Sequence, residues 1–559
     1  MTSVVTAGGV SVTTWGVIAD AEAVLDRLVS DGVPGALANK NAQLWGPDAA
    51  EEAGKRLGWL DLPETSRALL PRLAGLGSPG LDRVVLAGMG GSSLAPEVIT
   101  RTAGAPLTVL DTTDPHQVAR VVGDRLERTI VVVSSKSGGT VETDSHRRVF
   151  ERAFRDAGID PAERIVVVTD PGSPLEATAR EAGYAVVPAD PDVGGRYSAL
   201  TAFGLVPSAL AGVDVARLLD EAAGLSAALR LSYDNPGLAL GAALGASALA
   251  GRDKLIIADH ESGIFGFGDW AEQLIAESTG KQGRGLLPVV VEGVSAPGFE
   301  PADDVRRVVI GHRPDEFGGG QEDSAGGRDP AGLGVSGPLG AQFLLWEYAT
   351  AVAGRVIGIN PFDQPNVQES KDNTAALLRD AQEGAPPSAV SSEPALVTGA
   401  VEVHGPAELL GGAGDLRDLR DLFDILLEAV PDRGYLALMA YLDRVGEADV
   451  AGLRPSLAAR AGQSRKTPAP VTFGWGPRFL HSTGQYHKGG PPTGVFLQIT
   501  GAVTTDIEVP GKPYTFGQLQ LAQAFGDLRA LRSRGRPTIR LHLRDRSEGL
   551  AQLMDAAAT

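Results

Sequence analysis

A glutamate at the end of a short helix is well placed for acid–base chemistry in this chain. Residues 270–281 have the sequence Trp-Ala-Glu-Gln-Leu-Ile-Ala-Glu-Ser-Thr-Gly-Lys. Small and apolar residues recur there at helical spacing, and Gly280 is a typical stop residue, so we expect Glu277 on the last turn of a helix. A solvated surface glutamate is the ordinary alternative. The other motifs of the chain decide between the two.

A glycine-rich turn follows the first expected strand. Residues 83–87, an arginine followed by four apolar residues, lead into Gly-Met-Gly-Gly-Ser-Ser at 88–93, after which a helix begins. A strand, a glycine turn and a helix start present free backbone N–H groups to an anion. The next strand ends at Asp111, and an acid about twenty residues after a glycine turn is also the dinucleotide fingerprint. Ser93 stands where that fingerprint has its third glycine, and a nicotinamide enzyme remains an alternative.

A second polar loop combines hydroxyl groups with a lysine. The strand 129–133 leads into Ser-Ser-Lys-Ser-Gly-Gly-Thr-Val-Glu-Thr at 134–143. Short donors, flexible backbone and one fixed positive charge suit a phosphate monoester. A serine-rich turn that caps a helix is the simpler alternative. The loop does not have the Gly-x-x-x-x-Gly-Lys-Ser/Thr pattern of an ATP-binding loop.

Three further motifs carry polar side chains at the ends of expected elements. Arg196 follows two glycines, a setting that could aim its guanidinium, although a surface arginine is the commoner outcome. Residues 360–371 have the sequence Asn-Pro-Phe-Asp-Gln-Pro-Asn-Val-Gln-Glu-Ser-Lys, and residues 481–485 have the sequence His-Ser-Thr-Gly-Gln.

Composition excludes several classes of protein. The chain has 50 basic and 69 acidic residues, and its net charge of −19 argues against nucleic-acid or anionic-membrane partners. It has no cysteine, and its eight histidines lack a metal-binding spacing, so we expect no metal site. We recognise neither a signal peptide nor an apolar run long enough for a bilayer, and we expect a cytoplasmic protein.

Short strands that alternate with helices predict a parallel, doubly wound sheet with ligands at the carboxyl ends of its strands. The first set of expected strands is 83–87, 107–110, 129–133, 164–169 and 185–188. A second set is 254–258, 286–292, 306–310 and 356–359. In the C-terminal region we expect helices at 416–427 and 434–445 and strands at 470–475, 493–500 and 538–543. The helix-then-strand order of 342–359 recurs at 514–543, which suggests a partial internal duplication.

Five motifs, in this order, resemble those of the phosphoglucose isomerase family. They are the glycine turn 88–93, the hydroxyl-rich loop 134–143, Val-Gly-Gly-Arg-Tyr-Ser at 193–198, Gln-Leu-x-x-Glu-Ser-x-Gly-Lys at 273–281, and the run 360–371. The resemblance covers roughly residues 83–373. It implies an α/β protein with two flavodoxin-like, doubly wound parallel sheets, the sugar-isomerase domains, plus a C-terminal α/β region.

The local patterns and the resemblance together divide the chain into five parts. They are an N-terminal helical segment (1–80), a first sugar-isomerase domain with the phosphate loop (81–225), a second with the catalytic glutamate (226–382), a linker (383–396) and a C-terminal α/β region with the His-Ser-x-Gly-Gln motif (397–559).

Two departures from the family pattern stand out. The segment His481–Gln485 lies after Lys371, whereas bacterial members of the family usually carry it earlier. This order resembles the isomerase portion of bacterial fusions with transaldolase. His312 lies in the usual interval but lacks the motif, so we assign it to a surface loop. Gln368 stands where many members carry glutamate.

The resemblance assigns roles to individual residues. Glu277 would be the base that moves a proton between C2 and C1 of the sugar through an enediolate, and Arg196 would offset the developing charge. His481 and Lys371 would assist ring opening, although a structural histidine remains the alternative for His481. The substrate-binding set comprises Gly91, Ser92, Ser135, Lys136, Ser137, Thr140 and Gln364.

The implied function is the reversible isomerisation of glucose 6-phosphate and fructose 6-phosphate, a step of glycolysis and gluconeogenesis. It would need no cofactor, and its only ligand class would be hexose 6-phosphates. Because members of the family are commonly dimers, the resemblance also predicts a homodimer. A non-catalytic sugar-phosphate-binding regulatory module and a nicotinamide oxidoreductase are the alternatives from other classes. Mannose 6-phosphate would be an additional substrate within the same class.

Overall fold

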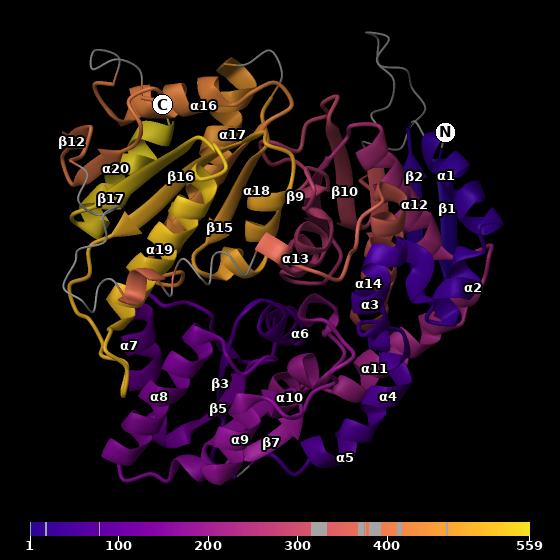
Figure 1. Cartoon of the computed structure of the whole chain (residues 1–559), viewed down its shortest axis with the longest axis horizontal. Helices are drawn as coiled ribbons and strands as arrows, with labels where there is room; N and C mark the ends of the chain where they lie inside the picture. The colour runs from indigo at the N-terminus through magenta and orange to yellow at the C-terminus, as the bar shows by residue number, and fades with distance from the viewer. Residues whose placement is uncertain are drawn as a thin grey trace.

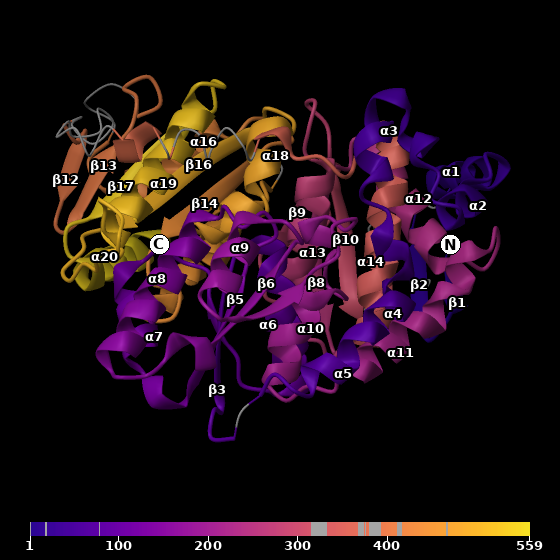
Figure 2. The same ribbon diagram turned by 60° about the horizontal axis from the view of Figure 1, so that its bottom comes forward.

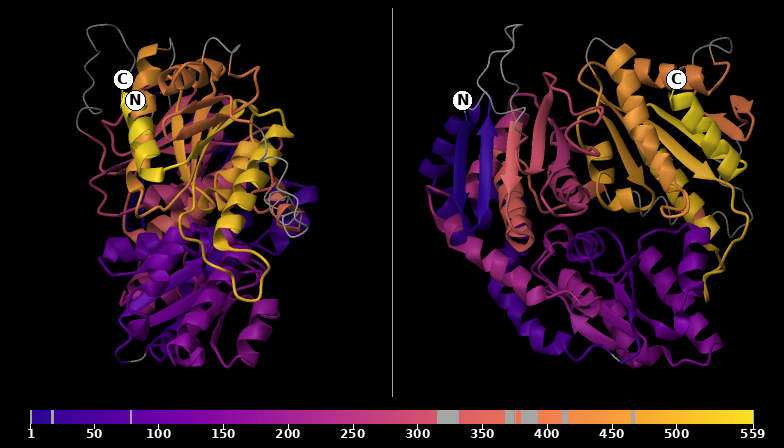
Figure 3. Two further views of the ribbon diagram at one scale, coloured as in Figure 1. Left: turned by 90° about the vertical axis from the view of Figure 1, so that its left-hand side faces the viewer. Right: turned by 180° about the vertical axis from the view of Figure 1, so that it is seen from behind.

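The computed structural model describes residues 2–16, 19–77, 79–314, 332–366, 374, 376–379, 393–410, 416–464 and 468–558. These residues form three units, each built on one β-sheet. Figure 1 shows the first unit below the other two, which stand side by side, and Figure 3 shows the same arrangement from behind.

The first unit has the predicted parallel, doubly wound sheet. Its strands are β3 (Arg83–Gly88), β4 (Thr108–Leu110), β5 (Thr129–Ser134), β6 (Ile165–Thr169) and β7 (Ala185–Pro188). They lie in the order β4-β3-β5-β6-β7, all parallel, which is the flavodoxin-like order 2-1-3-4-5. The accompanying helices are α6 (Leu94–Ala103), α7 (Pro115–Gly123), α8 (Val141–Asp156), α9 (Pro174–Glu181) and α10 (Ala202–Leu210). The predicted fold class is confirmed here.

The second unit has a mixed sheet. Its parallel strands are β8 (Lys254–His260), β9 (Leu287–Val290), β10 (Val305–Gly311) and β11 (Gly332–Ser336), in the order β11-β10-β8-β9. Its principal helices are α11 (Val215–Ser226), α12 (Pro236–Leu249), α13 (Phe267–Thr279) and α14 (Leu339–Ile357). The predicted strand at 356–359 is wrong, because α14 continues to Ile357 and ends at Gly358 with a left-handed φ of 79°.

The prediction that residues 1–80 are helical is also wrong at their start. β1 (Thr2–Ala7) and β2 (Val10–Trp15) form an antiparallel hairpin that extends the second sheet beside β11. The turn residues Gly8 and Gly9 both have positive φ, as a tight two-residue hairpin turn requires. Short helices do follow: α1 (Ala19–Ser30), α2 (Val33–Ala38), α3 (Pro47–Gly54), α4 (Leu62–Thr65) and α5 (Leu70–Leu73).

The third unit is built on six strands. They are β12 (Leu396–Thr398), β13 (Val401–His404), β14 (Tyr435–Tyr441), β15 (Val471–Trp475), β16 (Gly494–Gly501) and β17 (Thr538–Leu543). Its helices are α16 (Leu419–Ala429), α17 (Leu453–Ser464), α18 (Gly484–Gly489), α19 (Phe516–Arg532) and α20 (Arg546–Ala558). The helix predicted at 434–445 is wrong. Every residue of β14 is buried, and its Leu, Ala and Met residues, which favour helices in isolation, are covered on both faces of the sheet.

The second and third units share one topology. In the third, parallel strands lie in the order β17-β16-β14-β15, and the hairpin β12–β13 pairs antiparallel with β17 as β1–β2 pairs with β11. Figure 2 shows the two hairpins at opposite ends of the molecule. The chain therefore carries an internal duplication of topology, but it relates β8–β11 to β14–β17 rather than the segments expected from the sequence.

The two duplicated sheets meet at their β9 and β15 edges. One buried cluster includes Ile256 and Val289 of the second unit together with Met439 and Phe496 of the third. The third unit therefore shares a buried hydrophobic core with the second unit. Of the linker expected at 383–396, residues 383–392 lie outside the described residues, and β12 already begins at Leu396.

Candidate active site

Glu277 lies on the last turn of α13 and is buried. Its Oε1 atom lies 3.0 Å from Nη1 of Arg196, and its Oε2 atom accepts a hydrogen bond of 3.2 Å from Gln273 one turn earlier. A carboxylate held by one cation and one amide has a defined orientation. The predicted helix is confirmed, and Glu277 is not a solvated surface residue.

Arg196 is buried in the 3₁₀ turn Gly195–Tyr197 of the first unit. Its guanidinium donates to Ser278 Oγ (2.8 Å), to Gln364 Oε1 (2.8 Å) and to the carbonyl of Pro361 (2.7 Å). These contacts join the turn to α13 and to residues 360–364. The arginine is therefore fixed beside the glutamate by the fork of donors that a guanidinium provides.

Gly91 makes the close approach of two turns possible. A Cβ atom on Gly91 would lie 1.9 Å from the carbonyl oxygen of Gly195, next to Arg196. Ser92 belongs to the same buried 3₁₀ turn, Gly90–Ser92. The glycine turn thus packs directly on the turn that carries the arginine.

Lys281 anchors the loop that contacts Arg196. Its Nζ donates to the carbonyls of Asn360 (2.8 Å) and Asp363 (2.6 Å), and it lies 2.6 Å from a carboxylate oxygen of Asp363. Burial lowers the pKa of Lys281 to about 8, helped by the charge of Arg196 and opposed by Asp363.

His481 reaches this region from the third unit. It lies in the 3₁₀ turn Arg478–His481 that follows β15, and its Nε2 atom is 3.1 Å from Oε1 of Glu142. Its backbone carbonyl accepts a 2.7 Å hydrogen bond from the same Gln273 amide that contacts Glu277. Gln273 therefore links the displaced histidine segment to the glutamate.

The motif around His481 also forms hydrogen bonds with the end of α13 and with the loop that contains Asn366. Gln485, in α18, donates to the carbonyl of Gly280 (2.9 Å) and accepts from the backbone N–H of Asn366 (3.0 Å). A Cβ atom on Gly280 would lie 2.5 Å from Cα of Tyr486, so the end of α13 meets α18 at a position that only glycine fits.

The hydroxyl-rich loop lies at the start of α8, directly before Glu142. The hydroxyl groups of Ser135 and Thr140 are 2.9 Å apart, and Ser137 Oγ accepts the N–H of Gly139. Thr140 is the N-cap residue, but its side chain makes no capping hydrogen bond. The first-turn N–H groups of α8 are thus available to an anion.

Lys136 has a partner inside the protein. Its Nζ lies 2.6 Å from Asp170 and donates to the carbonyl of Asp190 at 3.2 Å. Its predicted contact with a phosphate stays a prediction. Lys371 and Gln368 lie outside the described residues, and His312 is exposed, as expected of a surface loop.

The sequence did not single out two residues of this site. Glu142 holds His481, and Gln273 connects His481 to Glu277. Gln273 precedes Glu277 by one helical turn, a spacing that could have indicated the contact. Glu142 resembles any acid in the first turn of a helix, and no local pattern indicates its contact with a residue 339 positions away.

Asp111 is not placed as a dinucleotide-binding acid would be. It is buried, 2.7 Å from Nη1 of Arg478 and 3.3 Å from Ser93 Oγ. Arg478 also contacts Glu97 at 2.6 Å. Burial opposes ionisation of Glu97, but Arg478 and Arg444 outweigh it and lower its pKa to about 2. Asp111 therefore belongs to an ionic junction between the first and third units.

The described parts of the chain contain neither a membrane-spanning helix nor a metal-binding cluster. No described helix combines the length and apolar character needed to cross a membrane. Among the same residues, no group of three or more His, Asp or Glu side chains is arranged to hold a metal ion.

Comparisons with known proteins identify relatives of the first two units. Residues 73–282 match the family model described as Phosphoglucose isomerase. A probable glucose-6-phosphate isomerase of Haloarcula marismortui is 39% identical over 221 residues, which are 38% of this chain and 50% of that protein. The glucose-6-phosphate isomerase of Thermosynechococcus vestitus is 32% identical over 342 residues, 52% of this chain and 65% of that protein. The chain thus spans between half and two thirds of the length of these two relatives.

Solved structures agree on the fold. A glucose-6-phosphate isomerase from Chlamydia trachomatis has a TM-score of 0.51 and 19% identity, covering 68% of this chain and 90% of that one. A hypothetical protein from Thermus thermophilus has a TM-score of 0.54 and 23% identity, covering 68% of this chain and 100% of that one. Residues 73–282 of this chain are thus similar in sequence to the phosphoglucose isomerase family, and the two solved structures have the same fold.

Proposed function

We propose that this protein interconverts glucose 6-phosphate and fructose 6-phosphate. The observation that carries the proposal is the chain of contacts Glu277–Gln273–His481–Glu142, which joins a buried carboxylate to a histidine and to the hydroxyl-rich loop. The names of the curated relatives support the same activity. A regulatory module that only binds sugar phosphates would not need this arrangement.

Glu277 is the proton carrier in this proposal. Its carboxylate takes the proton from C2 of the open-chain aldose, which gives an enediolate, and returns it to C1. The hydroxyl proton on O2 passes to O1 in the same conversion, so substrate and product are isomers. Arg196, 3.0 Å from Glu277, supplies a fixed positive charge for the enediolate oxygens. Because Arg196 is already held by Ser278 and Gln364, it need not reorganise as charge develops.

Ring opening requires a second acid–base group. His481 fills this role in the proposal, and Glu142 fixes its imidazole orientation through the Nε2 contact. Lys371 keeps its predicted part in the same step. A histidine held by a carboxylate on one ring nitrogen can exchange a proton through the other.

The phosphate group is bound by Ser135, Ser137 and Thr140 together with the N-terminus of α8. Ser92 and Gln364 position the sugar. Lys136 keeps its predicted part in binding the phosphate, and its Nζ is also paired with Asp170. Binding at the phosphate would orient the reacting carbons against Glu277.

The homodimer remains part of this proposal and rests on the family resemblance, and the cytoplasmic location remains the expectation drawn from the sequence. Glu277, Arg196, Glu142 and His481 meet within one chain, so these four residues need no second copy to come together.

Product analysis by NMR in deuterated water tests the function. With fructose 6-phosphate, we expect glucose 6-phosphate that carries deuterium at C2, because the proton on Glu277 exchanges with solvent. If mannose 6-phosphate also appears as a product in these spectra, it is a second substrate of the enzyme. If the protein binds fructose 6-phosphate but forms no product, the proposal of an isomerase is wrong, and a regulatory module that binds sugar phosphates explains the result.

A further inference from the structure

We infer that Gln523, in α19 of the third unit, is a positioning residue that sets how strongly Glu142 holds the proton of His481. The inference rests on the proposed function. Gln523 is fully buried, and its Nε2 atom donates a 2.7 Å hydrogen bond to Glu142 Oε1. The same oxygen faces His481 Nε2 at 3.1 Å.

The orientation of the Gln523 amide is determined by a third residue. Thr113, fully buried in the first unit, donates its hydroxyl to Gln523 Oε1 at 2.7 Å. With its oxygen occupied by this donor, the amide must present its NH₂ group to Glu142. Gln523 thus acts as a hydrogen-bond donor to the carboxylate and cannot act as an acceptor there.

Two donors share one carboxylate oxygen, and this sharing has an electrostatic consequence. A hydrogen bond to a carboxylate stabilises its charged form and reduces its attraction for another proton. The short contact with Gln523 therefore weakens the hold of Glu142 on the imidazolium of His481. Proton transfer from His481 during ring opening is then easier than it would be without Gln523.

Three other ionisable groups of the described residues interact electrostatically with Glu142: His146, Tyr441 and Tyr514. Burial lowers the pKa of His146 on α8 to about 4. Burial raises the pKa of Tyr441 on β14 and of Tyr514, which precedes α19. These three groups are uncharged near neutrality and therefore add no charge beside Glu142.

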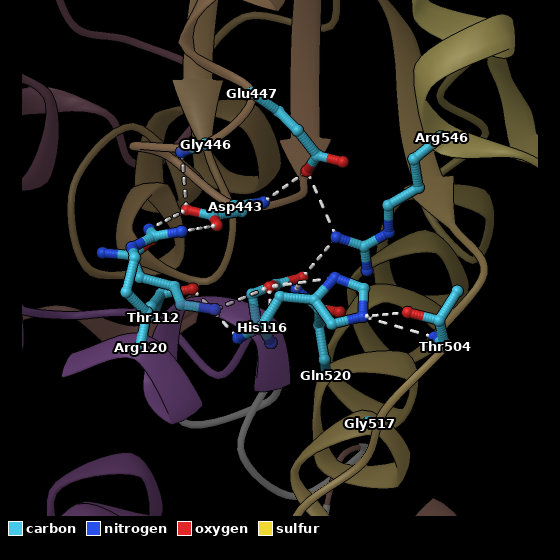
Figure 4. A network of polar contacts seen from close by, with 12 residues as sticks. Thr112, His116, Arg120, Asp443, Gly446, Glu447, Thr504, Gly517, Gln520 and Arg546 are labelled. Atoms are coloured by element: carbon cyan, nitrogen blue, oxygen red, sulfur yellow. Dashed lines mark hydrogen bonds and ion pairs between the residues drawn. The ribbon is translucent and has the colours of Figure 1, made fainter. Parts of the chain in front are cut away.

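The same helix offers a matched control. Gln520, one turn before Gln523, is also buried in the interface with the first unit, and its Nε2 atom donates to Asp114 Oδ2 at 3.2 Å. Figure 4 shows Gln520 in a separate network that includes Arg546 and His116. Asp114 there accepts a 2.8 Å contact from Arg546 and caps α7. Replacing Gln520 removes an interunit hydrogen bond of the same kind without touching Glu142.

The experiment compares Gln523→Met, Thr113→Val and Gln520→Met in the full-length protein. One readout is the pH–rate profile with glucose 6-phosphate, whose ring must open. The other is exchange of the C2 proton with deuterated water on an aldotetrose 4-phosphate. That sugar cannot form the ring, because the hydroxyl it would use carries the phosphate.

For Gln523→Met we expect about a tenfold lower rate with glucose 6-phosphate at neutral pH. The limb of the profile governed by His481 should move about one pH unit upward, the effect of losing one hydrogen bond to a charged group. Thr113→Val should give a smaller shift in the same direction, and it carries the test if Gln523→Met does not fold. Exchange on the aldotetrose phosphate should stay within about twofold of wild type, and Gln520→Met should leave the profile in place.

Three results would overturn the inference: an unshifted profile in both Gln523→Met and Thr113→Val, an equal loss on both substrates, or the same shift in Gln520→Met. A wild-type protein that does not convert hexose phosphates at all would instead refute the proposed function.

Discussion

The second and third units have the same strand order and the same antiparallel hairpin, yet they contribute opposite halves of the candidate site. In the second unit the helix after the first parallel strand, α13, carries Glu277. In the third unit the corresponding helix, α17, carries no site residue, and the turn after the second parallel strand carries His481. The duplicated scaffold places loops, and the side chains on those loops decide the chemistry.

Contacts across the β9–β15 boundary are also duplicated. At equivalent positions, however, one unit carries the basic residue where the other carries the acidic one. Arg454 at the start of α17 bonds to Glu292 after β9, with Nε and Oε1 2.7 Å apart. In the reciprocal position, Arg478 after β15 lies 3.8 Å from Asp269 at the start of α13. The two units therefore face each other through equivalent surfaces, although only the Arg478 side also joins the ionic junction with Glu97 and Asp111.

From this comparison we expect the largest loss of activity on replacing Glu277, the carboxylate of the second unit. Glu277→Gln should reduce turnover of fructose 6-phosphate by about 10⁴-fold, since the amide cannot accept the C2 proton. The fold and sugar-phosphate binding should remain, which a thermal melt and a binding titration would verify. Glu292→Gln in the same unit is the control and should retain most of the activity. A Glu277→Gln enzyme with a near-normal rate would place the base elsewhere.

The histidine of the third unit should matter for one step only. His481→Asn should lower turnover of glucose 6-phosphate by about 10² to 10³-fold, because ring opening loses its acid–base group. Deuterium exchange on an open-chain aldotetrose phosphate should be nearly unaffected. A point substitution is preferable to deleting the third unit, because deletion also removes Arg478 from the buried junction. Equal losses on both substrates would assign His481 a structural role.

The smallest expected effect concerns Lys281, an anchor of the second unit. Its folded-state pKa of about 8 lies below that of an unfolded lysine, near 10.5, so the folded protein loses this proton first. Between these two pH values the unfolded chain binds more protons, and the contribution of Lys281 to the free energy of unfolding rises with pH. Activity should fall over the same range, because the charge that holds residues 360–363 is lost.

Urea unfolding from pH 7 to 10 separates the two effects. The wild type should gain stability relative to Lys281→Met as the pH rises, while its turnover declines near pH 8. A difference between the two proteins that does not change with pH would show that Lys281 is not the titrating group.

Local patterns predicted much of the fold and part of the site. The first sheet was recognisable because its strands are short, largely apolar and bounded by turns. Glu277, Arg196 and Gln364 could be named from their motifs, and the structure brings these three together. The hairpin 2–15 also has a local signal, because its two alternating strands are joined by a Gly-Gly turn.

Residues 435–441 show where such patterns fail. Leu, Ala and Met favour a helix when neighbours on the chain are considered alone, and only burial between two layers makes this segment a strand. The topological duplication was hidden for a similar reason, since it lies in strand pairing between distant segments.

The sequence by itself determined which turns can approach closely and which helix ends in a carboxylate, because glycine placement and apolar spacing act over a few residues. Only the tertiary structure decided that His481, Gln273, Glu142 and Gln523 meet. Their contacts join residues up to 381 positions apart, and the packing of three units supplies a proximity that no local pattern encodes.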